Sequence, residues 1–220
     1  SLCYNTPMKK LLLLLLCLVW AKSASAFCRT ITPRVYVETK TGSVRYITHL
    51  SRDEFLRRAP QKMSPNTLGM TVSKLAMNGR AEPDMQRVDA RTFCVQIKEI
   101  NLTLGYDILD VYIDKKYQPG SCEYEVVKEH ENFHVRVSQE AMQFFKPDID
   151  RALRSAAQKI RPTFVTSQGE AQAAFEKQFK QITNEIQPLI DHINKKIAEK
   201  NYIIDTPESY RATTALCSHW

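Results

Sequence analysis

Residues 121–145 read SCEYEVVKEHENFHVRVSQEAMQFF, and this stretch predicts a long amphipathic helix. Ser121 is a favourable N-cap residue, and the acidic residues Glu123 and Glu125 suit the positive end of the helix dipole. Several apolar residues and two histidines recur at alternating spacings of three and four, which is typical of one buried stripe. The stripe comprises Val127, His130, His134, Val137, Ala141 and Phe144. Pro147 predicts the end or an interruption of this helix.

The same stretch contains the motif HExxH, as HENFH at residues 130–134. Four residues advance an α-helix by about 400°, so His130 and His134 project from one face and can chelate a divalent metal. Glu131 lies beside that face, where its carboxylate can take a proton from a metal-bound water. A Zn²⁺ ion held by neutral imidazoles lowers the pKa of its water to about 7. The motif therefore indicates hydrolysis, most often of a peptide bond.

A zinc site of this kind needs a third protein ligand and one open position. The spacing HExxHxxGxxH would place that ligand at Glu140, with Val137 at the glycine position. On a continuing helix, however, Glu140 points away from the histidine pair. A glutamate from a later helix is another source of the ligand, and Glu176 and Glu185 are available there.

The rest of the chain predicts an α+β fold, in which mostly antiparallel N-terminal strands pack with a C-terminal helical half that carries the HExxH helix. Residues 27–117 are strand-rich. Their predicted elements are a hairpin of strands 35–39 and 44–48 with a turn at 40–43, a short helix at 51–58, and strands at 70–77, 92–104 and 108–113. Residues 118–220 are helical in character. After the HExxH helix come a helix at 148–160, a long helix from Ser167 or Gly169 that is kinked at Pro188, and a loop or short turn at 203–210.

Residues 1–26 are expected to be extra upstream sequence and a cleaved signal peptide. Two lysines follow Met8 and precede the apolar run 11–20, and an A-x-A site then predicts cleavage before Phe27. The apolar run is too short to span a membrane. We expect residues 27–220 to form one exported domain, periplasmic or extracellular, with no membrane contact after cleavage. Cleavage removes three lysines and no acid, so the formal charge falls from +7 to +4. That charge is dispersed, which argues against a nucleic-acid partner.

Four cysteines lie after residue 26, namely Cys28, Cys94, Cys122 and Cys217. An even number in an exported chain predicts two disulfides, and three pairings are open. One possibility is that Cys122 ties the HExxH helix to another element.

Residues 104–210 as a whole resemble the predicted secreted zinc-dependent protease family of bacteria. The resemblance consists of a strand, the sequence CEYEVVKE leading into HENFH, a long helical segment and a late turn. That turn is similar to D-x-x-T-x-H-G in the family and reads DTPESYR at residues 205–211, where only the aspartate matches. The resemblance implies a zincin-like domain. It suggests Asp205 as the third zinc ligand, with Glu208 second, and Tyr210 as a hydrogen-bond donor to an oxyanion.

The leading hypothesis is an exported zinc metallopeptidase that acts on a peptide or protein. In it His130 and His134 bind Zn²⁺, Glu131 is the general base, and the strand around residues 109–113 pairs with an extended substrate. The alternative is an exported, non-catalytic interaction or scaffold protein with a degenerate or structural HExxH metal site.

Overall fold

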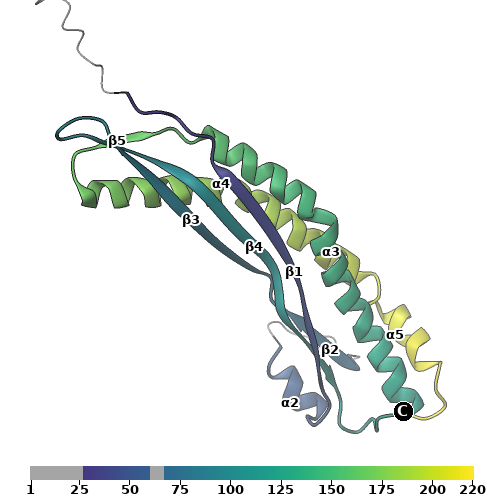
Figure 1. Cartoon of the computed structure of the whole chain (residues 1–220). Coiled ribbons are helices and arrows are strands. Elements are labelled where there is room, and N and C mark those ends of the chain that lie inside the picture. Colours follow the sequence, from purple (N-terminus) through teal and green to yellow (C-terminus); the bar gives the residue numbers. More distant parts are fainter. Residues whose placement is uncertain (1–26, 60–66) are drawn as a thin grey trace, which may run out of the picture.

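The computed structural model describes residues 27–59 and 67–220 (Figure 1). The predicted signal peptide at 1–26 lies outside the described residues. The described elements in chain order are β1 (Arg34–Ile47), α2 (Arg52–Leu56), β2 (Gly69–Ser73), β3 (Ala76–Arg87), β4 (Phe93–Ile113), α3 (Cys122–Lys159), β5 (Thr163–Val165), α4 (Gln168–Tyr202) and α5 (Pro207–Thr214).

The strand β4 is the centre of one mixed sheet. β1 pairs with it in parallel, and β2, β3 and β5 pair with it antiparallel. β3 lies along the first half of β4, and β2 lies along its last residues, Leu109–Ile113. Four of the five described strands come from the N-terminal half and the long helices from the C-terminal half, so the predicted α+β class is confirmed.

Two long helices bury the apolar side of β4. α3 contacts β1, β2 and β4, whereas α4 contacts β3, β4 and β5 (Figure 1). The core between them is built mostly of branched aliphatic side chains, which pack well on strands. It includes Ile97, Ile100, Leu102, Leu104, Leu109, Val127, Met142, Ile149, Leu153, Ile182, Ile186 and Ile193.

The predicted hairpin turn at residues 40–43 is wrong, because β1 continues through it as one strand. Gly42 has a φ of 76° and is skipped in the pairing, since Thr41 pairs with Tyr106 and Ser43 with Ile108. The register is the same on both sides of Gly42, so the glycine interrupts the ladder at one position of a strand whose partner comes from far along the chain. Local turn chemistry could not reveal that partner.

The other strand boundaries differ for the same reason. The predicted strands at 92–104 and 108–113 merge into β4, and the predicted strand at 70–77 divides into β2 and β3. β3 extends to Arg87 despite Pro83, which sits at a register shift in the pairing with β4. A proline is tolerated at such an irregularity because it need not donate to the ladder.

The predicted end or interruption of the helix at Pro147 is also wrong, because α3 continues to Lys159 and includes most of the helix expected at 148–160. A proline inside a helix costs about 3 kcal/mol. Met142, Ile149 and Leu153 are at most 1% exposed on the two sides of Pro147. Burial of each such side chain contributes about 1.5–3 kcal/mol, so packing outweighs the proline. Phe144 is 74% exposed and does not belong to the buried stripe.

The sequence predicted the helix start at Ser121 and gave Ser167 or Gly169 for the next long helix, but it missed the start at Thr206. The side chains of Ser121 and Ser167 accept the backbone N–H groups of Tyr124 and Glu170 and cap α3 and α4. α4 continues through Pro188, as expected. The tail predicted as a loop contains α5, which Thr206 caps.

Two disulfides stabilise the described part of the chain. Cys28 pairs with Cys94 and joins the segment before β1 to β4. Cys122 pairs with Cys217 and joins the first turn of α3 to the segment after α5, as the sequence had suggested for Cys122. Disulfides persist in oxidising compartments, so these bonds are consistent with export. None of the described helices is long and apolar enough to cross a membrane.

The close approach of β1 to β4 gives a prediction at Gly105. Its φ is 147°, and an added Cβ would overlap the backbone of Lys40. We expect Gly105→Ala to lower the free energy of unfolding by more than about 2 kcal/mol, measured by urea denaturation. Gly169→Ala is the matched control, because a Cβ there meets nothing within 4 Å. Similar stability of the two variants would contradict the steric argument.

Candidate metal centre

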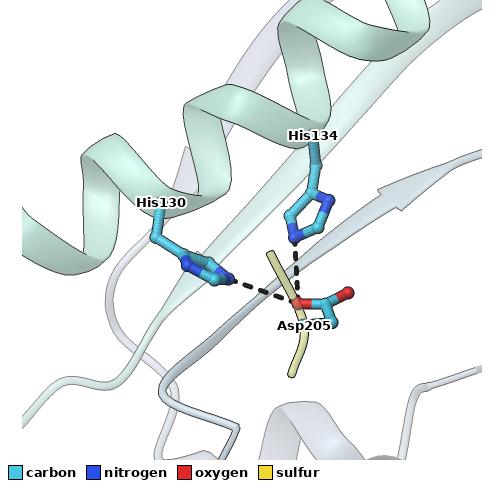
Figure 2. A group of neighbouring side chains, drawn as sticks. All are labelled: His130, His134 and Asp205. Carbon is cyan, nitrogen blue, oxygen red and sulfur yellow. Dashed lines mark hydrogen bonds and ion pairs between the residues drawn. The ribbon is translucent and has the colours of Figure 1, made fainter. Parts of the chain in front are cut away.

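The two histidines of the HExxH motif lie side by side on α3 and are shielded from solvent. Their side chains are 7% and 10% exposed, and their ring centroids are 5.2 Å apart in an edge-to-face arrangement. Figure 2 shows both rings directed from α3 towards the same carboxylate. The spacing of four residues thus has the predicted consequence, which is two imidazoles converging on one point.

Asp205 is that carboxylate, and it comes from the short connection between α4 and α5. Its Oδ1 lies 3.3 Å from Nε2 of His130 and 3.3 Å from Nε2 of His134. The three ligand atoms lie within 4.8 Å of one another, so the group could hold a metal ion. Tetrahedral zinc bonds of about 2.0–2.1 Å separate two ligand atoms by roughly 3.3–3.4 Å. The two distances from the histidines to Asp205 match that edge length.

Neighbouring polar groups fix the orientation of this triad. Nδ1 of His134 lies 3.1 Å from Oδ1 of Asn201, which selects the tautomer that leaves Nε2 free to bind a metal. The hydroxyl of Tyr210 donates to Oδ1 of Asp205 at 3.0 Å, and its ring stacks on His130 at 5.3 Å. The sequence did not reveal Asn201, because an asparagine near a helix end carries no spacing signal.

Glu131 is held between α3 and β2 and is only 3% exposed. The hydroxyl of Thr71 lies 2.8 Å from Oε2 of Glu131 and donates to it. A Cβ on Gly69 would lie 2.8 Å from Oε1 of Glu131, so the glycine lets the backbone of β2 approach the carboxylate. Thr71 and Gly69 were not predicted, because nothing in the sequence indicates that β2 lies against this turn of α3.

The electrostatics of the group follow from burial and from close partners. Partial burial favours the neutral form of Asp205, but contacts with both imidazoles hold the pKa of this carboxyl well below its usual range. Burial, and then the negative charge of Asp205, raise the pKa of Tyr210, which therefore stays a protonated donor. Burial also raises the pKa of Glu131. Burial lowers the pKa of His134, but its contacts with Asp205 and Glu131 outweigh that effect and raise it overall.

A cleft opens onto these groups. Its volume is about 400 Å³, and it is bounded by β2, by α3 and by the end of α4 with the following turn. Glu131, His134, Asp205 and Tyr210 all line it. A small molecule or an extended chain in this cleft would therefore meet Glu131 together with His134 and Asp205, two of the three candidate ligands.

The other candidate ligands lie outside the group of two histidines and Asp205. Glu140 pairs with Lys200, Glu185 with Lys159 and Glu208 with Arg211. Glu176 accepts a hydrogen bond from Gln172.

The predicted substrate-pairing strand at 109–113 is wrong. These residues form the end of the central strand β4 and pair with β1 on one side and β2 on the other. Among the described strands, residues 109–112 therefore have neighbours on both sides.

The disulfide of Cys122 gives a prediction about metal affinity. It holds the segment after Asp205 against the start of the helix that carries both histidines. We expect Cys122→Ser with Cys217→Ser to weaken Zn²⁺ binding by about tenfold or more, since ordering Asp205 then costs more conformational entropy. Competition with a chromophoric chelator measures the affinity.

The matched control removes the other disulfide, by Cys28→Ser with Cys94→Ser. That bond joins elements that carry no ligand, so Zn²⁺ affinity should stay within about twofold while both variants lose stability. An equal loss of affinity in the two variants would show that the Cys122–Cys217 bond has no particular role at the centre.

Comparisons of the chain with protein-family models, with curated proteins and with solved structures found no match. The resemblance of residues 104–210 to a bacterial protease family therefore stays a prediction. We infer function from the geometry of the candidate metal centre.

Proposed function

We propose that the protein is an exported zinc-dependent hydrolase that cleaves peptide bonds. The observation that carries this proposal is the convergence of His130, His134 and Asp205, whose ligand atoms lie within 4.8 Å of one another. Two imidazoles and one carboxylate are a donor set that suits Zn²⁺. Catalytic zinc typically has three protein ligands and one open position, and the cleft beside His134 and Asp205 would give water or substrate access to that position.

Each residue has a role in this proposal. Bound Zn²⁺ would lower the pKa of a water and polarise a carbonyl group. Glu131 would take a proton from that water and pass it to the leaving amine. Its raised pKa suits this task, because a carboxyl group nearer to neutral pH both accepts and releases protons. Tyr210 would donate a hydrogen bond to the carbonyl oxygen as negative charge develops on it.

The strand β2 favours an extended peptide as the substrate. β2 pairs with β4 on one side, and no described strand pairs with its other side. Gly69 and Thr71 of β2 both line the cleft and both approach Glu131. A peptide added along this edge would gain backbone hydrogen bonds and pass beside the metal ligands. β2 therefore takes the role that the sequence had assigned to residues 109–113.

Metal content tests the first half of the proposal. The purified protein should contain one Zn²⁺ per chain by elemental analysis, and His130→Ala should lose most of it, since two ligands cannot complete the site. His49→Ala is the control, because His49 is exposed and lies outside the group. A protein without metal after equilibration with Zn²⁺ would contradict the proposal.

Replacement of the proposed base tests the second half. Glu131→Gln keeps shape and Zn²⁺ but removes the proton acceptor, so hydrolysis of a quenched fluorogenic peptide library should fall by at least about 10²-fold. Glu140→Gln, on the exposed side of the same helix, should hydrolyse at the wild-type rate. Equal rates for wild type and Glu131→Gln would instead favour the non-catalytic alternative.

A further inference from the structure

A second hollow adjoins the cleft lined by Glu131, His134 and Asp205, which we call the metal cleft. Unlike the metal cleft, the second hollow is lined by positively charged side chains. It has a volume of about 410 Å³ and lies between α2, the segment after β4 and α5. We call it the cationic pocket. The residues that line it include Arg52, Thr67, Lys116, Tyr210 and Arg211.

Three cations line the cationic pocket, and no Asp or Glu is among its described lining residues. Arg211 pairs with Glu208 at 2.7 Å, but both side chains are at least 70% exposed, so solvent screens that pair. Lys116 places its ammonium 4.6 Å from the centroid of the Tyr117 ring and makes no ion pair in the described part of the chain. Lys116 and Arg211 together therefore give the described lining more positive than negative charge.

The cationic pocket and the metal cleft share a wall. Tyr210 lines both, and it hydrogen-bonds Asp205 in the metal centre. Thr67 and Leu68 line the cationic pocket and lead directly into Gly69, the first residue of β2. Nε of Arg52 donates to the backbone oxygen of Thr67 at 2.9 Å and so fixes this segment to α2.

The direction of β2 determines which part of a substrate would reach the pocket. β2 runs from Gly69, beside Glu131, to Ser73. A peptide that pairs antiparallel with β2 runs the opposite way, so its C-terminal part lies beyond Gly69, towards Thr67. At about 3.3 Å per residue, Thr67 is only roughly 7–13 Å from the level of Gly69 and Thr71. One of the first few substrate residues after the scissile bond would therefore lie at the cationic pocket.

We propose that the cationic pocket binds a carboxylate of the substrate on the C-terminal side of the scissile bond, through Lys116 and Arg211 beside Arg52. This specificity rests on the proposed peptidase function of the neighbouring cleft. Guanidinium groups recognise carboxylates with paired hydrogen bonds, and an ammonium adds charge without a fixed geometry. The carboxylate is an acidic side chain or the free C-terminus of the peptide.

Direct binding tests the pocket without relying on catalysis. The probe is a fluorescein-labelled alanine peptide that ends in two glutamates and has a free C-terminus, added to the zinc-loaded protein and followed by fluorescence anisotropy. It should bind at least about tenfold more tightly than the same peptide with two glutamines and an amidated end. Two further peptides, glutamate with an amide and glutamine with a free acid, separate the side chain from the C-terminus as the source. Equal affinity for all four peptides would overturn the proposal.

Substitutions of the lining residues test whether the preference for the acidic peptide comes from the cationic pocket. Lys116→Ala with Arg211→Ala should abolish the preference for the acidic peptide. Arg151→Ala with Lys177→Ala removes the same charge from exposed positions on α3 and α4 outside the pocket. This control variant should still prefer the acidic peptide. Lys116→Glu with Arg211→Glu should turn the preference towards a lysine-containing peptide, a gain that misfolding cannot produce. If both double-alanine variants lost the preference for the acidic peptide equally, the net charge of the protein and not this pocket would attract the peptide.

Cleavage of the same peptides separates this inference from the proposed function. If the wild type cleaves peptides with and without downstream acids at the same kcat/KM, the pocket proposal is wrong and the peptidase proposal stands. If the acidic peptide binds at the pocket but no peptide is cleaved, the peptidase proposal fails and the anion site remains.

Discussion

The contact between Asp205 and the two histidines is the constraint on which the site depends. It joins Asp205 to His130, 75 positions earlier, and to His134, and it brings the carboxylate within 3.3 Å of two shielded imidazoles. Burying such groups is unfavourable unless each has a partner. The partners come from Asn201 at the end of α4 and Tyr210 on α5, and the Cys122–Cys217 bond joins the segment after α5 to α3. The C-terminal part of the chain thus supplies Asp205, Asn201 and Tyr210 to the site that the two histidines of α3 begin.

The approach of β2 to α3 is the second requirement. Gly69 provides room for the Glu131 carboxylate, and Thr71 donates to it. This leaves Glu131 buried but facing a cleft, with a hydrogen bond that holds its orientation. Because β2 pairs on one side only among the described strands, the same strand that orients Glu131 also offers backbone groups to a peptide. Positioning of the proposed base and access for a substrate therefore depend on one short strand.

Local signals predicted those parts of the fold that depend on neighbouring residues. Ser121 and Ser167 cap the long helices; the sequence predicted the first start and gave Ser167 as one of two alternatives for the second. Signals at Gly42 and Pro147 were misleading, because packing with distant elements decided the outcome. β1 pairs with β4 along its whole length, and buried side chains on both sides of Pro147 keep α3 continuous. Capping acts within one turn, whereas strand pairing and burial act across the whole chain.

The sequence by itself determined the donor types and their helical spacing, since HExxH places His130 and His134 on one face of any helix that contains them. It also suggested Asp205, through a resemblance and not through geometry. Only the tertiary structure decided that Asp205 meets the histidines, that Asn201, Thr71 and Gly69 support them, and that a cationic pocket adjoins the cleft. The physical reason is that these contacts join separate elements, whose relative placement is fixed by core packing around β4 and by disulfides, and not by periodicity.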